Sequence, residues 1–302
     1  MLGRALSMHE SARDVLARAA SVIGADAVER YAAPAGARLD TNRDIQLSVF
    51  LTTQLHLAAL QADGIDTNAS LGLSLGEYSH LVHIGALTFE SALALVDARG
   101  AAYDESPPGV MVTILGASRD QVDEVVAAAR VRGMVVVSNY NAPTQHVLAG
   151  DAPAVERAAE QLEEKFGAHT IQTESRVPMH SPLLADVAQR FRVDLACAPW
   201  QAPRHAYVPN ATGRVEPDPT PQVLIDRLFA HVTEPVRWQD SIEALAAAQP
   251  DAIFVEVGPG EILHNMLARR WLPVPRAHTD DRSHGDPAGH FRAVQQEIRD
   301  HA

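Results

Sequence analysis

A serine between two glycines is the first place in this chain where residue types and spacing point to chemistry. Residues 72–76 read Gly-Leu-Ser-Leu-Gly and fit the pattern Gly-x-Ser-x-Gly. A serine in this pattern lies on a tight strand-to-helix turn that projects its hydroxyl from the edge of a sheet. The helix that follows begins with N–H groups that have no partner within the helix, so the Leu75 amide can donate to an oxyanion. Ser74 is therefore a candidate nucleophile for acyl transfer.

The same residues also fit a structural role. Ser74 followed three residues later by Glu77 matches a capping box, in which the serine hydroxyl and the glutamate close the first turn of a helix. Pentapeptides of this form also occur by chance. Taken alone, the pattern leaves the catalytic and the capping interpretations open.

A serine is a weak nucleophile at neutral pH and needs a base. The chain contains 14 histidines, and His180 has the most distinctive setting. It lies in Val-Pro-Met-His-Ser-Pro (177–182), between an expected strand and an expected helix capped by Ser181. An ordered connection of this kind can aim an imidazole at a site, and a histidine on an exposed loop is the alternative.

The elements that position these residues alternate between strands and helices. Hydrophobic patterning predicts a buried strand over 67–73, a helix over 75–84 and a helix over 89–99 that Thr88 caps and Gly100 follows. The central third has the order β-α-β-β-α-β of a ferredoxin-like unit. Its expected strands cover 110–115, 134–138, 146–149 and 169–174, and its helices 119–131 and 153–166. Further strands over 205–209 and 253–257 favour a mostly parallel sheet in the remainder.

Composition limits the classes of function. A 302-residue chain with 46% hydrophobic and 21% charged residues can bury a large core. Its net charge of −13 argues against binding nucleic acid. Cys197 is the single cysteine, so no internal disulfide forms. No apolar run reaches the length of a membrane span, and residues 1–10 lack a signal-peptide core, so we expect a cytoplasmic protein with no membrane association.

Several segments, in order along nearly the whole chain, together resemble malonyl-CoA:acyl-carrier-protein transacylases and the related acyltransferase domains of polyketide synthases. They are Gly-Leu-Ser-Leu-Gly-Glu-Tyr-Ser (72–79), Gly-Ala-Leu-Thr-Phe-Glu (85–90), Leu-Val-Asp-Ala-Arg-Gly (95–100), Asn-Tyr-Asn-Ala-Pro-Thr-Gln (139–145), Val-Leu-Ala-Gly (147–150), Val-Pro-Met-His-Ser (177–181), Glu-Pro-Val-Arg-Trp (234–238) and Glu-Val-Gly-Pro-Gly (256–260). A collinear set of this kind is far more specific than the pentapeptide alone.

The resemblance implies an α/β fold in two parts. The larger is an α/β hydrolase-like domain with a mostly parallel sheet, formed by residues 1–106 and 177–302. The smaller is an inserted ferredoxin-like subdomain over residues 107–176. This division agrees with the order of elements expected from the patterning.

The resemblance also implies a ping-pong reaction. Ser74 takes a malonyl group from coenzyme A and passes it to the phosphopantetheine thiol of an acyl carrier protein, with His180 as base and the Leu75 N–H as oxyanion donor. Arg99 matches the family arginine that pairs with the malonyl carboxylate, although it could instead complement the C-terminal end of its helix. Coenzyme A thioester is then a substrate, and we expect no permanently bound cofactor and no metal.

Departures from the family pattern leave alternatives open. The family begins with a strand and a Phe-Pro-Gly-Gln-Gly-Ser-Gln-like loop that supplies a second oxyanion donor, and this chain starts just after it. Met179 stands where polyketide acyltransferases carry residues associated with the choice of acyl group. Transfer of another acyl group, also between two carrier proteins, is therefore an alternative, followed by a serine thioesterase and a non-catalytic partner of a synthase. The acyl donor, the fatty-acid or polyketide pathway, the replacement for the loop and the oligomeric state are not fixed by the sequence.

Overall fold

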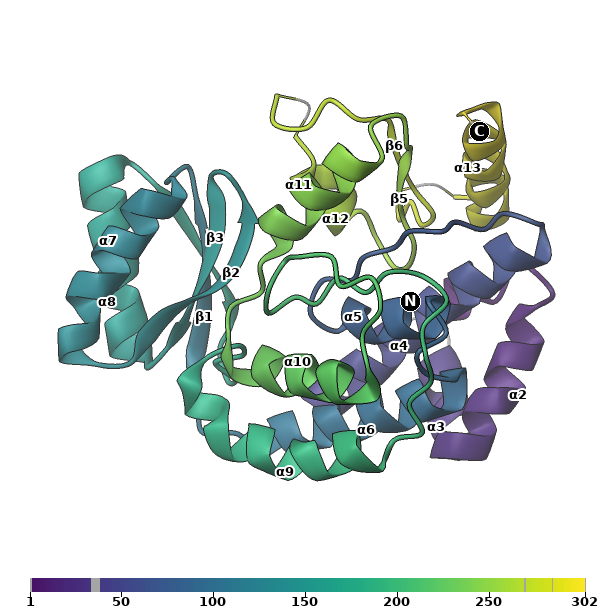
Figure 1. Cartoon of the computed structure of the whole chain (residues 1–302), viewed down its shortest axis with the longest axis horizontal. Coiled ribbons are helices and arrows are strands. Elements are labelled where there is room, and N and C mark those ends of the chain that lie inside the picture. The colour runs from purple at the N-terminus through teal and green to yellow at the C-terminus, as the bar shows by residue number, and fades with distance from the viewer. Residues whose placement is uncertain (1, 34–38, 269, 284, 302) are drawn as a thin grey trace.

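A group of helices and a separate small sheet dominate the computed structural model, which describes residues 2–33, 39–268, 270–283 and 285–301 (Figure 1). The helices are α1 Leu2–Ala5, α2 Ala12–Ile23, α3 Ala25–Ala32, α4 Asn42–Ala62, α5 Gly76–His83, α6 Phe89–Asp104, α7 Arg119–Ala129, α8 Ala152–Phe166, α9 Ala185–Cys197, α10 Pro221–Thr233, α11 Trp238–Ala248, α12 Ile262–Met266 and α13 Pro287–His301. The strands are β1 Val110–Leu115, β2 Val135–Ala142, β3 Gln145–Gly150, β4 His169–Glu174, β5 Phe254–Glu256 and β6 Arg276–His278. Met1 and Ala302, the outer limits of the expected large domain, lie outside the described residues.

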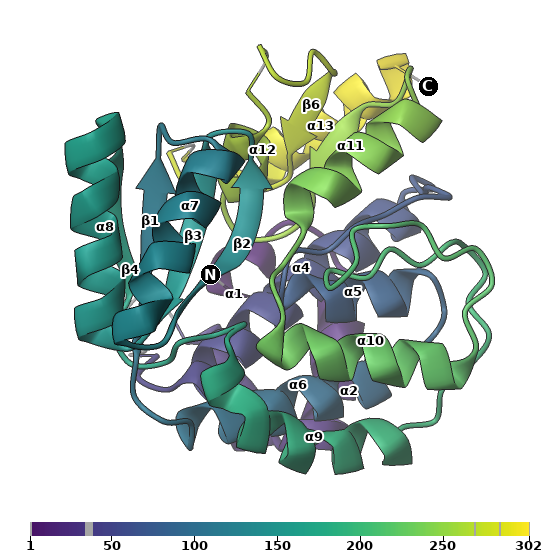
Figure 2. The ribbon, with the colours of Figure 1, turned by 60° about the vertical axis from the view of Figure 1, so that its left-hand side comes forward.

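The small sheet has the predicted β-α-β-β-α-β order. Its four strands are antiparallel and lie in the order β2-β3-β1-β4. Helices α7 and α8 cover one face of it in both views (Figures 1 and 2). Buried side chains such as Ile114, Val126 and Leu162 form a separate core between these two helices and the sheet. The expected limits of this subdomain at residues 107 and 176 stay a prediction.

Helices α4 and α6 pack against each other and carry residues of the site. Thr41 and Thr88 cap them, because each threonine hydroxyl accepts the N–H of the residue three positions on. The expected end of α6 at Gly100 is wrong, since the helix continues to Asp104. A Cβ atom at position 100 would lie 2.5 Å from the Arg43 Cα, so this glycine serves the close approach of α4 and α6 rather than a helix end. Arg99 therefore lies within α6, which excludes the role of complementing its C-terminus.

The larger part contains less sheet than predicted. Residues 67–73 form no strand, and residues 205–209 contribute one isolated bridge, between Tyr207 and Glu216. Among the described residues the parallel pairing between strands is confined to β5 and β6. A segment becomes a strand by pairing with a neighbouring backbone, and no described strand pairs with 67–73. The structure is mixed α/β with an antiparallel sheet, and the hydrolase-like description stays a prediction. None of the described helices is both long and apolar enough to span a bilayer.

Several histidines are buried in an uncharged form. Burial lowers the pKa of His56 and of His146 to about 4, and that of His80 to about 3. The His80 Nε2 atom accepts the Val208 N–H, so protonation would remove the acceptor of a buried backbone donor. These imidazoles therefore favour the native state only while they are neutral.

We expect the free energy of unfolding to fall as the pH drops below about 6.5, the ordinary pKa of histidine. Below that value the unfolded chain binds protons that the folded chain does not bind until the pH approaches the lowered values. Each such histidine costs up to about 1.4 kcal/mol per pH unit over this range. Urea unfolding at pH 7.5, 6.5 and 5.5 measures the effect, with the exposed His169→Asn variant as a control that keeps the same slope. Equal stability at all three pH values would contradict the assignment.

Candidate active site

The turn that carries Ser74 is unusually tight. Ser74 has a φ of 50°, in the left-handed region that residues other than glycine rarely adopt. A Cβ atom at Gly72 would lie 2.0 Å from the Gly76 carbonyl oxygen, so the first glycine of the motif is required by the close approach of its own chain. A Cβ atom at Gly76 would meet nothing within 4 Å, which leaves open space beside the serine. Helix α5 begins directly after this turn.

The structure brings Ser74 and His180 together from positions 106 residues apart. The Ser74 Oγ and the His180 Nε2 lie 2.8 Å from each other. The His180 Nδ1 lies 2.7 Å from the backbone carbonyl oxygen of His231, which can only accept, so Nδ1 carries the proton and Nε2 is free to receive one. Burial, together with the nearby Arg99 charge and against the hydrogen bond to His231, lowers the pKa of His180 to about 3. His180 is therefore neutral at pH 7, as a base must be.

Backbone strain marks these two residues. Among the described residues other than glycine, Ser74 and His180 alone have positive φ, at 50° and 57°. Such conformations cost about 1–3 kcal/mol each and persist where surrounding contacts enforce them. Met179, next to His180, packs against both the large helical core and one face of the small sheet. His180 therefore lies where the two parts of the fold meet.

The Leu75 amide lies at the start of α5. The neighbouring amides are engaged, since the Ser74 N–H donates to the Asn210 Oδ1 and the Gly76 N–H donates to the Leu73 carbonyl. Within the described part of the chain, no hydrogen bond uses the Leu75 N–H as donor. This amide is available to an incoming oxygen, and its role as oxyanion donor stays a prediction.

Arg99 reaches the same point from α6. Its Nη2 lies 3.2 Å from the Ser74 Oγ, and its Nη1 donates to the Gln46 Oε1 at 2.6 Å. The guanidinium also lies 4.4 Å from the centre of the Tyr103 ring. Arg99 is only 2% exposed, and no carboxylate of the described residues forms an ion pair with its guanidinium. A buried cation beside a nucleophile, without a paired anion, suits a substrate that brings its own negative charge.

The capping-box interpretation of Ser74 and Glu77 is wrong. Helix α5 has no side-chain cap, and Glu77 instead lies fully buried beneath the turn. Its carboxylate accepts the hydroxyl of Tyr207 and the backbone N–H of Asn210, and it lies 3.0 Å from the His231 Nδ1. Burial raises the pKa of Glu77 to about 8, against these hydrogen bonds and the charge of Arg99. Glu77 therefore contacts residues that support the site and does not cap the helix.

Two supporting residues, Asn210 and His231, were not found from the sequence. The Asn210 side chain accepts the Ser74 N–H at 2.7 Å and donates to the Gly72 carbonyl at 2.6 Å, so it holds both sides of the turn. The His231 ring stacks on that of His180 at 4.6 Å and is tied to Glu77, while its carbonyl orients the His180 ring. The available signal was Glu77 itself, an acidic residue in the first turn of a helix whose other residues are mostly buried.

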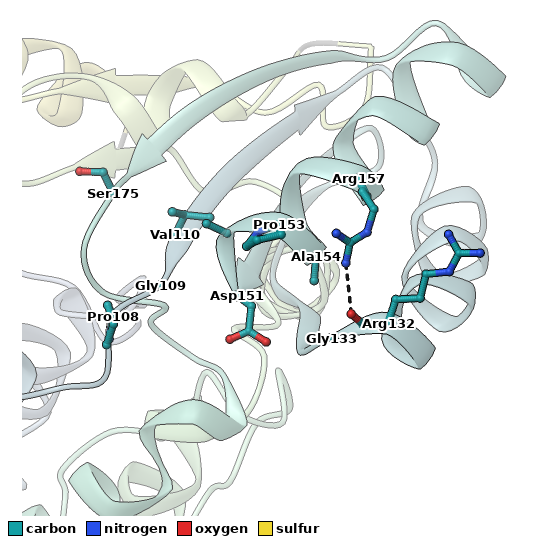
Figure 3. Close-up of a pocket in the computed structure, with 11 residues that line it drawn as sticks. Pro108, Gly109, Val110, Arg132, Gly133, Asp151, Pro153, Ala154, Arg157 and Ser175 are labelled. Carbon is teal, nitrogen blue, oxygen red and sulfur yellow. Dashed lines mark hydrogen bonds between the residues drawn. The ribbon is translucent and has the colours of Figure 1, made fainter.

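A separate cavity lies in the small subdomain. It has a volume of about 600 Å³ and contains none of the residues of the serine site. Its wall includes Asp151 and Arg157 of the α8 region, and the Arg157 guanidinium donates to the carbonyl of Arg132 (Figure 3). No pairing of nucleophile and base lies in this wall, so the serine turn remains the candidate for chemistry.

Comparisons with known proteins agree on one family. A family model described as acyl transferase domain matches residues 3–274. The polyketide biosynthesis protein ThaF of Burkholderia thailandensis is 32% identical over 238 residues, which cover 78% of this chain and 20% of ThaF. The malonyl CoA-acyl carrier protein transacylase of Bacillus subtilis is 32% identical over 72% of this chain and 70% of its own length. A crystal structure of malonyl CoA-acyl carrier protein transacylase from Clostridium perfringens superposes with a TM-score of 0.89 at 27% identity and covers 99% of this chain and 93% of that one.

Replacing Asn210 by alanine should destabilise the fold, because the Ser74 N–H and the Gly72 carbonyl then lose their partner in a buried turn. Each unsatisfied group costs about 1–3 kcal/mol, so we expect the free energy of unfolding to fall by about 2–6 kcal/mol. Urea unfolding measures the change. The exposed Asn68→Ala variant is the matched control and should stay within about 0.5 kcal/mol of the unaltered chain. An Asn210→Ala variant as stable as this control would show that Asn210 does not hold the turn.

Proposed function

We propose that this chain, which belongs to the acyl transferase domain family, transfers a malonyl group from coenzyme A to the phosphopantetheine thiol of an acyl carrier protein. The observation that carries the proposal is the Arg99 guanidinium, buried and 3.2 Å from the Ser74 hydroxyl. A nucleophile–base pair alone would suit many acyl groups. The added cation favours an acyl group that ends in a carboxylate, and the names of the Bacillus and Clostridium proteins give malonyl transfer to a carrier protein as the activity of those relatives.

The first half-reaction forms an ester on Ser74. The Ser74 Oγ attacks the thioester carbonyl while its proton moves to the His180 Nε2, 2.8 Å away. The carbonyl oxygen becomes an oxyanion that the free Leu75 N–H stabilises. The C–S bond then breaks, and His180 returns the proton to the departing thiolate of coenzyme A. Ser74 is left acylated and His180 neutral, ready for the second acceptor.

The second half-reaction repeats these steps with another thiol. The phosphopantetheine thiol of the carrier protein gives its proton to the His180 Nε2 and attacks the ester carbonyl. The ester C–O bond breaks, and His180 protonates the departing Ser74 oxygen. The carbonyl of His231 holds the imidazole in the tautomer that both steps need. In each half-reaction, therefore, one proton passes from the nucleophile to His180 and then from His180 to the leaving group.

Arg99 would set the substrate class. A guanidinium binds a carboxylate through two parallel hydrogen bonds, and burial strengthens this pairing. Gln46 orients Arg99 through its Oε1, and its Nε2 has no partner among the described residues, so it is available to a substrate oxygen. The Bacillus protein is named a malonyl CoA-acyl carrier protein transacylase, which supports the proposed transfer to a carrier protein. ThaF is named a polyketide biosynthesis protein, which supports a role in polyketide synthesis.

Replacing Arg99 by alanine should remove the preference for malonyl groups. A hydrogen bond to a charged group contributes about 1.5–3 kcal/mol, so kcat/KM for transfer from malonyl-CoA to a carrier protein should fall by about 10–150-fold. Transfer from acetyl-CoA, which has no carboxylate, should change little or improve. Mass spectrometry of the acylated carrier protein measures both reactions.

Two further variants make this test specific. Ser74→Ala should abolish transfer from both donors and so defines the background. Arg99→Lys keeps the charge but loses the two-point contact, and it should fall between the unaltered chain and Arg99→Ala. An equal loss for malonyl-CoA and acetyl-CoA in Arg99→Ala would contradict the proposed role of Arg99. Transfer of a non-malonyl group in preference to malonyl by the unaltered chain would instead favour the alternative substrate class.

A further inference from the structure

We propose that Glu261, His264 and His278 form a binding site for one divalent transition-metal ion of the zinc type. One side-chain ligand atom of each residue lies within 4.8 Å of those of the other two. The site shares no residue with the serine site, and no metal is expected there from the sequence. Two imidazoles with one carboxylate are a ligand set typical of zinc, which completes its tetrahedral coordination with water.

The fold brings the three residues together from two elements that are adjacent in space. Glu261 directly precedes α12, and His264 lies three residues later, on the same side of this short helix. His278 ends β6, whose parallel pairing with β5 places it opposite Glu256. The Glu256 carboxylate in turn accepts the His264 backbone N–H at 2.8 Å, which fixes the start of α12 against the β5–β6 pair. The backbone that carries the three ligands is therefore held by its own hydrogen bonds.

Hydrogen bonds orient both imidazoles for ligation. The His278 Nδ1 lies 3.2 Å from the backbone carbonyl oxygen of Asp280, which can only accept, so Nδ1 carries the proton. The His264 Nδ1 lies 3.2 Å from the Asn265 Oδ1, an amide oxygen that also accepts. In both rings the Nε2 then presents a lone pair. Metal-bound histidines usually donate their second ring N–H to a carbonyl or carboxylate in this manner.

One pair of ligand atoms has a spacing close to that of a metal site. The His278 Nε2 and the Glu261 Oε2 lie 3.6 Å apart. Tetrahedral bonds of about 2.0–2.1 Å place neighbouring ligand atoms about 3.3 Å apart, so a small rotation of the Glu261 side chain brings this pair to the required distance. Glu261 is exposed and can make this movement, whereas the two histidines are half-buried. The His264 and His278 ring centres are 4.8 Å apart and tilted by 59°, so the rings are not stacked face to face.

The neighbouring groups add further support. His290 of α13 packs on His278 with ring centres 5.2 Å apart, and its Nε2 lies 2.9 Å from the His278 carbonyl oxygen. This contact attaches α13 to β6 from the side opposite α12 and fixes the His278 backbone. The competing explanation of the cluster is an ordinary ion pair between a protonated His278 and Glu261. The two explanations differ in whether His264 takes part and in whether a metal binds at neutral pH.

The test uses the full chain without an affinity tag, freed of metal with a chelator and then dialysed. Isothermal titration with Zn²⁺ at pH 7.5 should show one site, and Co²⁺ should give the visible absorption of a tetrahedral site. His264→Ala and Glu261→Gln should each weaken Zn²⁺ binding by at least about 100-fold, because the loss of a direct ligand exceeds the 10–100-fold effect of an outer contact. His169→Ala, an exposed histidine on β4, is the matched control and should bind Zn²⁺ like the unaltered chain. Mg²⁺ should not bind, because the site offers two nitrogen ligands.

Melting in the presence of chelator checks that the variants fold. Glu261 is exposed, so Glu261→Gln should melt with the unaltered chain when no metal is present, and it keeps the test valid if His264→Ala does not fold. Added Zn²⁺ should raise the melting temperature of the unaltered chain and of His169→Ala only. The absence of Zn²⁺ binding would overturn the proposal, as would binding that survives both His264→Ala and Glu261→Gln.

Discussion

The hydrogen bond between the Ser74 hydroxyl and the His180 imidazole depends on two backbone positions that resist the conformation they adopt. Both residues lie in the left-handed region, and both carry side chains that disfavour it. Several surrounding contacts hold Ser74 and His180 in this conformation. The Asn210 side chain bonds the backbone on both sides of Ser74, and the His231 carbonyl fixes the ring of His180. Both supports converge on the buried carboxylate of Glu77.

Burial of charge is the second feature that joins structure to chemistry. Arg99 lies out of water, and so does Glu77, whose pKa burial raises to about 8 against the charge of Arg99. No carboxylate of the described residues contacts the guanidinium, which instead faces the serine hydroxyl. A buried charge without a close partner destabilises the fold. A ligand of opposite charge can offset this destabilisation when it binds. Burial also keeps His180 neutral. The same buried surroundings therefore favour both a neutral base and the proposed pairing of Arg99 with a carboxylate.

Local signals predicted much of this arrangement. The small sheet and its two helices follow from hydrophobic patterning. The capping box that Ser118 and Gln121 form at the start of α7 was found only in the structure. The glycines around Ser74 predicted the tight turn, and the setting of His180 predicted an ordered histidine. The roles of Ser74, His180, Leu75 and Arg99 remain proposals that the geometry supports.

What the sequence did not reveal depends on contacts between distant segments. Residues 67–73 have a strand-like pattern, but no strand of the described residues pairs with them. Glycine is typical of a helix end, and the close approach of Arg43 explains why Gly100 instead lies within α6. Asn210 and His231 carry no local pattern, because their function comes from the partners that the fold places next to them. The same is true of His264 and His278, which lie close together because β5 pairs with β6 and the Glu256 carboxylate of β5 accepts the His264 N–H.

The central claim is that this strained turn makes Ser74 the residue that carries the acyl group. The most direct measurement is the intact mass of the purified chain after incubation with malonyl-CoA without carrier protein, followed by mapping of the modified peptide. The account predicts one added malonyl group, located on Ser74, lost on addition of a carrier protein and not formed by Ser74→Ala. A malonyl group on another residue, or one that still forms on Ser74→Ala, would contradict it.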